Sequence, residues 1–74
     1  MLNKNLLISK MKLYGDTQES LANHIGLSVP RVNAKINGTA GAEFSQSEIV
    51  KIKEKYNLSD EDVIQIFFVN DVSF

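Results

Sequence analysis

Residues 21–38, LANHIGLSVPRVNAKING, have apolar side chains at helical spacing, but Gly26 and Pro30 interrupt the pattern. Gly26 can take the left-handed conformation that ends a helix, because it has no Cβ. Ser28 can cap a new helix, and Pro30 then lies in the first turn, where its missing N–H costs nothing. The stretch therefore predicts two helices joined by a tight turn.

Further signals predict three more helices and the start of the second. Leu2, Leu6, Leu7 and Met11 have the spacing of one face of a helix at 4–14. Thr17 and Ser59 precede apolar segments of helical period, and Ser45 with Glu48 has the spacing of a capping box. We therefore expect an all-α fold, a compact bundle of five short helices that contains a helix-turn-helix formed by the second and third. The predicted elements are helices at 4–14, 17–25 and 28–37, a loop at 39–44, a helix between Ser45 and Asn57, and a fifth helix after Ser59.

Each predicted helix has one apolar face that is expected to point inward. The inward residues are Leu2, Leu6, Leu7, Met11 and Tyr14 in the first helix; Leu21, Ala22 and Ile25; Val32 and Ile36; Ile49, Ile52 and Tyr56; and Val63, Ile64, Phe67 and Phe68. After them, the tail at 69–74 (VNDVSF) alternates apolar and polar residues, a strand-like period. We divide the chain into a helix-turn-helix domain at 1–68 and this tail.

Composition excludes several classes of function. The chain has 74 residues, no Cys and one His, and 43% of its residues are apolar, which is typical of one small globular domain. Without Cys or a second His beside His24, we expect no disulfide, no metal or cofactor, no small-molecule substrate and no enzymatic activity. The acids Asp60, Glu61 and Asp62 suit the first turn of a helix. No apolar run is long enough for a membrane span, and we expect a cytoplasmic protein.

The charges are unevenly distributed along the sequence. The formal net charge of -1 by itself argues against a nucleic-acid partner. However, residues 1–40 contain five basic and two acidic side chains, whereas residues 41–74 contain three basic and seven acidic ones. We therefore expect the first half to face DNA and the acidic turn at 60–62 to point away from it.

The pair of helices at 17–38 has the residues that a helix-turn-helix requires. Ala22 is small where the two helices approach, Gly26 makes the turn, and apolar residues can fix the angle between the helices. Those apolar residues are Leu21, Ile25, Leu27 and Val32. Such corners also occur in helical bundles that do not bind DNA, so the spacing alone leaves that alternative open.

TQESLANHIGLSVPRVNAKING, residues 17–38, resembles the helix-turn-helix of the Cro and phage-repressor class, often called the XRE family. AKING, EFSQSEIVKI, NLSDED and IFF, at 34–68, are similar to segments of small phage-encoded regulators of Gram-positive hosts, so the resemblance covers about residues 4 to 68. It implies five helices, a homodimer that binds a palindromic operator in double-stranded DNA, and repression in a phage or prophage.

The outward face of the third helix supplies the candidate base contacts. With Val32 and Ile36 inward, this face presents Val29, Pro30, Asn33, Ala34 and Asn37, with Arg31 and Lys35 on its flanks. Asn33 can pair with adenine, Arg31 or Lys35 can reach guanine or phosphate, and the apolar residues can contact thymine methyl groups. This predicts a preference for A·T-rich sequence.

The starts of the second and third helices supply candidate phosphate contacts. Thr17, Gln18 and Ser28 stand where side chains and backbone N–H groups can hold a phosphate, and the resemblance assigns that role to Gln18. Asn37, Thr39 and the loop amides can hold the next phosphate. The alternative is that Gln18 and Ser28 are ordinary capping residues.

Two questions about partners remain open from the sequence. The apolar tail 69–74 favours a homodimer through paired tails, but it could instead fold back over the first and fourth helices. Likewise, the apolar face of the third helix could bind a partner protein, a regulator, in place of DNA. We expect DNA binding and a homodimer.

Overall fold

The computed structural model describes residues 2–68. These residues form five α-helices and one short 3₁₀ turn, which confirms the predicted all-α bundle. The elements are α1 (Lys4–Leu13), α2 (Gln18–Ile25), α3 (Val29–Asn37), η1 (Thr39–Gly41), α4 (Gln46–Lys55) and α5 (Asp60–Phe67). The predictions for the tail at 69–74, including its strand-like character and its dimer contact, lie outside the described residues.

Side-chain caps decide where the helices begin. Capping boxes open α2, α4 and α5, with Thr17 and Ser20, Ser45 and Glu48, and Ser59 and Asp62 bonding reciprocally. The helices from α2 on begin one residue after each predicted cap, because a capping residue keeps an extended backbone while its side chain accepts an N–H of the first turn.

The turn between α2 and α3 has the geometry that the sequence predicts. Gly26 ends α2 with a left-handed backbone at φ 77°, and Leu27 N donates to Ala22 O at 3.0 Å. Ser28 then caps α3, and its Oγ accepts the N–H of Arg31 at 3.3 Å. Only three residues separate the helices, and α2 and α3 pack directly on each other.

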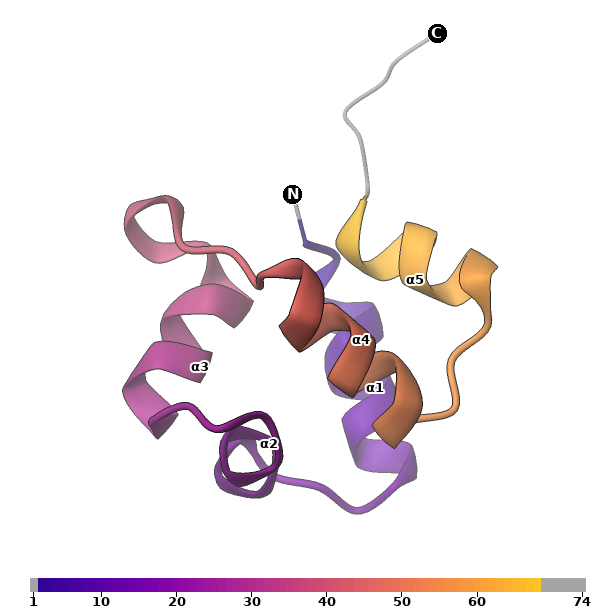
Figure 1. Ribbon diagram of the computed structural model, residues 1–74, viewed down its shortest axis with the longest axis horizontal. Helices are drawn as coiled ribbons and strands as arrows, with labels where there is room; N and C mark the ends of the chain where they lie inside the picture. Colours follow the sequence, from indigo (N-terminus) through magenta and orange to yellow (C-terminus); the bar gives the residue numbers. More distant parts are fainter. Residues whose placement is uncertain (1, 69–74) are drawn as a thin grey trace, which may run out of the picture.

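One hydrophobic core joins all five helices. Leu7, Leu21, Val32, Ile52 and Ile66 are fully buried at its centre. In Figure 1, α3 and α5 lie on opposite sides of the molecule, with α1 and α4 between them and α2 across one end. The segment before α1 is held against the end of α5, because Asn3 N donates to Ile66 O at 2.7 Å.

The inward face of α5 differs from the prediction. Ile66 is fully buried, whereas Ile64 and Phe68, which were expected inside, are 58% and 52% exposed. Val63 is half-buried and Phe67 is buried, as expected. α5 lies at the edge of the bundle (Figure 1). Within residues 2–68, α1 and α4 pack on the side of α5 that holds the buried Ile66, which leaves the i, i+4 pair Ile64 and Phe68 exposed.

The connections between helices contribute core residues that helical periodicity could not find. Phe44 ends the predicted loop at 39–44, yet it is buried and meets Phe67 edge to face with ring centroids 6.0 Å apart. Leu58, between α4 and α5, is also buried. Tyr14 was expected inside but is 48% exposed, with one side of its ring against Tyr56.

The helices are short. α1 and α4, the longest in the described part of the chain, have 10 residues each. Within residues 2–68 no helix has the length and hydrophobicity to cross a lipid bilayer.

Candidate nucleic-acid interface

The outward face of α3 brings together most of the predicted contact residues. Val29, Pro30, Arg31, Asn33 and Asn37 are exposed on α3. Ala34 is half-buried beside them. The opposite face of the helix, with Val32 and Ile36, is buried in the core, which leaves the exposed face accessible to a ligand.

Four hydrogen-bonded side chains form what we call the polar row: Gln18, Asn33, Asn37 and Lys4. Asn33 Nδ2 donates to Gln18 Oε1 at 3.2 Å, which links α3 to the start of α2. Asn37 Nδ2 donates to Asn33 Oδ1 at 3.2 Å and to Asn33 O at 2.9 Å. Lys4 Nζ, from α1, donates to Asn37 Oδ1 at 2.8 Å. The row therefore fixes side chains from three helices on one surface.

Asn33 occupies the middle of the row and keeps part of its hydrogen-bonding capacity. Its amide nitrogen has two N–H groups, of which Gln18 takes one, and its carbonyl oxygen has two lone pairs, of which Asn37 takes one. The two neighbours orient the amide group. One donor and one acceptor are left on an exposed side chain.

Sequence reasoning missed Lys4. Its position at the start of α1 gives no sign that it meets α3, because the hydrogen bond to Asn37 spans 33 residues. No ion pair within residues 2–68 involves Lys4, so its ammonium is a positive charge at the C-terminal end of the exposed face. Only the packing of α1 against the rest of the bundle reveals this.

The helix starts differ in what they offer a phosphate. Thr17 and Ser28 each use the side-chain oxygen as a cap, accepting from Ser20 N and Arg31 N. α3 has Pro30 in its first turn, which removes one backbone N–H. α2 has no proline in its first turn, but it has the acidic Glu19 there. Neither start is a strong anion site by itself.

Lys35, predicted as a DNA contact on the flank of this face, is paired with an acid of α4. Its Nζ lies 2.8 Å from Glu48 Oε1 of α4, and the two side chains are only 13% and 15% exposed. The residue follows Asn33 by two positions, and this turns its side chain toward α4. Arg31, by contrast, is exposed and belongs to no ion pair of the described chain.

Folding pairs some of the basic residues of the first half of the chain with acidic residues of the second half, which reduces the charge asymmetry seen in the sequence. Three ion pairs join the two halves of the chain: Lys10 with Asp62, Lys35 with Glu48, and Lys55 with Asp16. The basic residues of the first half that form no such pair within residues 2–68 are Lys4, Lys12 and Arg31. The acidic start of α5 lies across the bundle from α3 (Figure 1).

A polar cluster holds the start of α2 against the end of α4. Asp16 Oδ2 lies 3.2 Å from Lys55 Nζ, and Ser20 Oγ donates to Asp16 Oδ1 at 3.3 Å. Burial raises the pKa of Asp16, but the hydroxyl of Tyr56, Lys55 and Ser20 together outweigh it and hold the pKa below its usual value. Burial and the nearby carboxylate raise the pKa of Tyr56 well above its usual value.

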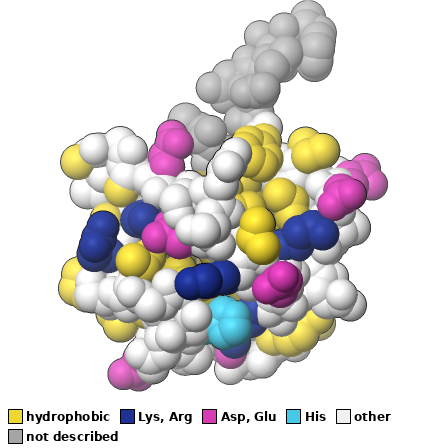
Figure 2. Space-filling model, viewed as in Figure 1, with side chains coloured by type: hydrophobic (Ala, Val, Ile, Leu, Met, Phe, Trp, Pro, Cys, Tyr) yellow, Lys and Arg dark blue, Asp and Glu magenta, His cyan; other side chains and the backbone are white. Residues whose placement is uncertain are grey.

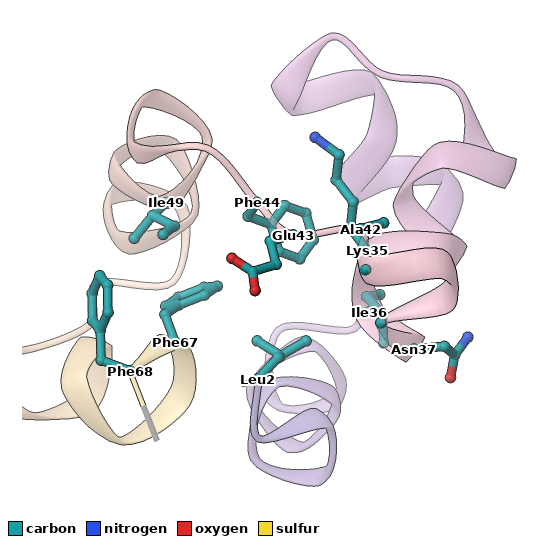
Figure 3. Close-up of a pocket in the computed structure, with 12 residues that line it drawn as sticks. Leu2, Lys35, Ile36, Asn37, Ala42, Glu43, Phe44, Ile49, Phe67 and Phe68 are labelled. Atoms are coloured by element: carbon teal, nitrogen blue, oxygen red, sulfur yellow. The ribbon is translucent and has the colours of Figure 1, made fainter. Parts of the chain in front are cut away.

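A groove of about 480 Å³ opens beyond the end of α3. It runs between the start of α1, the segment 41–44 and the end of α5, and its apolar lining includes Leu2, Phe44 and Phe68 (Figure 3). Thr39, a predicted phosphate contact, is exposed at the start of η1. On the face seen in Figure 2, hydrophobic surface lies over α4 and α5.

Comparison with protein-family models, with curated proteins and with solved structures found no match to this chain in any of the three.

Proposed function

We propose that this protein is a sequence-specific, DNA-binding regulator of transcription that inserts α3 into the major groove. The observation that carries the proposal is the state of Asn33, which is exposed at the middle of α3 and oriented by Gln18 and Asn37. The remaining N–H and lone pair of its amide match the N7 acceptor and N6 donor of adenine.

The residues around Asn33 fit the same partner. Val29 and Pro30 offer apolar surface to thymine methyl groups, which supports a preference for A·T base pairs. Arg31 and Lys4 are exposed cations on either end of this face and can hold phosphates. Gln18 both supports Asn33 and stands at the start of α2, beside the path of a phosphate backbone.

The charge distribution supports this orientation. The acids at the start of α5, Asp60, Glu61 and Asp62, lie on the side of the bundle opposite α3 (Figure 1). With α3 in the groove, these carboxylates stay away from the phosphates, which would repel them.

The resemblance of residues 17–38 to the Cro and phage-repressor class supports a role as a repressor of phage or prophage genes in the cytoplasm of a bacterial host. We propose that a homodimer binds a palindromic operator, with the two copies of α3 about 34 Å apart in successive major grooves. No cofactor, metal or small-molecule substrate is part of this proposal.

A second candidate is a protein-interaction module that binds a partner regulator instead of DNA. Val50, Ile64 and Phe68 are 51%, 58% and 52% exposed, and they give α4 and α5 an apolar surface of the kind that packs on another protein. This surface is distinct from the exposed face of α3, so each candidate can be tested separately.

The test is binding of the full chain to labelled duplexes from the DNA that flanks its gene, at stated salt concentrations. We expect one duplex to bind at least about 10³-fold more tightly than random sequence. We also expect the affinity to fall steeply between about 50 and about 200 mM salt, as phosphate contacts are screened. Sedimentation with the bound duplex should report two chains per operator. Equal, weak binding to every duplex, combined with tight binding to a partner protein, would favour the interaction module.

A further inference from the structure

The ion pair between Lys35 and Glu48 is well shielded from solvent. Lys35 Nζ also lies 5.9 Å from the centre of the Phe44 ring, so the ammonium is enclosed by a carboxylate and an aromatic face. In Figure 3 the Lys35 side chain stands next to Phe44, beside the end of α3. The pair joins α3 to α4.

Glu48 serves both ends of this connection. Its Oε1 accepts from Ser45 N at 2.9 Å, and Ser45 Oγ accepts from Glu48 N at 3.3 Å, so Glu48 is part of the box that begins α4. Burial raises the pKa of Glu48, but the hydrogen bonds from Lys35 and Ser45 outweigh it and lower the pKa overall. One carboxylate thus couples the start of α4 to the side of α3.

We propose that Lys35 is a positioning residue, which together with Glu48 sets the angle and depth at which α3 enters DNA without itself contacting DNA. This inference rests on the proposed function. The charge of Lys35 is already neutralised by a carboxylate at 2.8 Å, and its side chain is 13% exposed. Reaching a phosphate would leave Glu48 as an unpaired, half-buried anion.

The first test measures how salt affects binding of the cognate duplex. A lysine that contacts a phosphate adds about one unit to the slope of log affinity against log salt concentration. We expect Lys35→Met to weaken cognate binding several-fold with an unchanged slope. Lys4→Met, the matched control in the polar row, should reduce the magnitude of this slope by about one. A reduced slope for Lys35→Met would overturn the proposal.

The second test asks whether removing the negative charge of Glu48 strengthens or weakens DNA binding. Glu48→Gln removes a negative charge but keeps an oxygen that can cap α4, since Gln also serves in a capping box. General electrostatics predicts tighter DNA binding after loss of an acid. We expect weaker cognate binding instead, equal to that of Lys35→Met, and no additional loss in the double variant. Glu43→Gln, an exposed acid in the neighbouring loop, is the control and should not weaken binding. Tighter DNA binding by Glu48→Gln would overturn the proposal, because it would mean that Lys35 contacts DNA once Glu48 no longer pairs with it.

A conservative variant separates the charge from the packing. Lys35→Arg keeps a cation that can pair with Glu48, so it should restore most of the affinity for the cognate duplex that Lys35→Met loses. Failure of Lys35→Arg to bind better than Lys35→Met, while it unfolds at the same urea concentration as the unmodified chain, would contradict the role of the ion pair.

Hydrogen exchange keeps the two proposals distinguishable. We expect Lys35→Met, but not Lys4→Met, to speed amide exchange in α3 in the absence of DNA, because the helix loses its tie to α4. If the unmodified chain binds no duplex, the proposed function fails, and faster exchange still supports the positioning of α3. Unchanged exchange in Lys35→Met would refute that positioning whatever the DNA result.

Discussion

α2 and α5 have the same length and begin in the same way, but they differ in how well the sequence predicts which face is buried. Each has eight residues and opens with a capping box. α2 buries Leu21, Ala22 and Ile25, the three residues expected inside, and has no other apolar side chain. In α5 and the residue after it, five of the six positions 63–68 are apolar, so several faces satisfy the same pattern. A sparse apolar pattern determines a buried face, whereas a dense one does not.

The largest expected effect tests which face of α5 is buried. Ile66→Ala removes methylene and methyl groups from a fully buried site and should lower the free energy of unfolding by about 2 to 5 kcal/mol. Ile64→Ala, two positions away on the same helix, should change it by less than about 0.5 kcal/mol, because that side chain is 58% exposed.

Urea unfolding followed by circular dichroism measures both variants. Comparable losses for Ile64→Ala and Ile66→Ala in a chain that stays monomeric would mean that both sides of α5 are covered. If the loss for Ile64→Ala instead grew with protein concentration, the open side of α5 would be a contact between chains.

The next effect concerns the exposed face of α3. Asn33→Ala should cost about 1 to 3 kcal/mol of binding to the cognate duplex and remove the preference at one base pair. Gln65→Ala, which removes an exposed amide from α5, is the matched control and should leave binding unchanged. Binding to a panel of duplexes with single substitutions measures both. An equal loss on cognate and random DNA would make Asn33 a phosphate contact.

Acid should loosen the connections of α2 and α3 to α4. The pKa values of Asp16 and Glu48 lie below their ordinary values of 3.8 and 4.5, so the folded chain binds protons less readily than the unfolded chain. The stability that these carboxylates contribute is therefore complete above about pH 5 and is lost as the pH falls through their lowered pKa values. The urea midpoint should drop between about pH 5 and about pH 3.

Two variants with an uncharged amide in place of the carboxylate test whether Asp16 and Glu48 cause this loss of stability in acid. Asp16→Asn and Glu48→Gln should each lower the urea midpoint at neutral pH and flatten its fall in acid, because the titrating carboxylate is gone. Glu54→Gln, on the exposed side of α4, should do neither. An unchanged acid profile in both variants would place the dependence on other carboxylates.

The smallest expected effect lies in the turn after α3. Ala40 has φ 54°, a left-handed backbone that costs an L-residue with a Cβ more than it costs glycine. Ala40→Gly relieves this strain but makes the unfolded chain more flexible, so we expect a net gain of about 0.5 kcal/mol in the free energy of unfolding. A net loss would indicate that the Ala40 side chain stabilises the turn.

The sequence by itself determined where the helices begin and end, and which face of each sparsely apolar helix is buried. Caps such as Ser28 and turn glycines such as Gly26 act on backbone groups within about four residues, so these signals can be read locally. The exposed face of α3, with Asn33 at its centre, followed from the burial of Val32 and Ile36.

The tertiary structure decided everything that depends on which helices meet. It turned Lys35 toward Glu48, brought Lys4 to Asn37 and selected Ile66 over Ile64 for the core. Lys35 and Glu48 are 13 residues apart in the sequence, and Lys4 and Asn37 are 33 apart. The choice of Ile66 depends on which side of α5 packs on the neighbouring helices. A hydrogen bond or ion pair needs its two atoms within about 3 to 4 Å of each other, and the packing of the helices sets that distance.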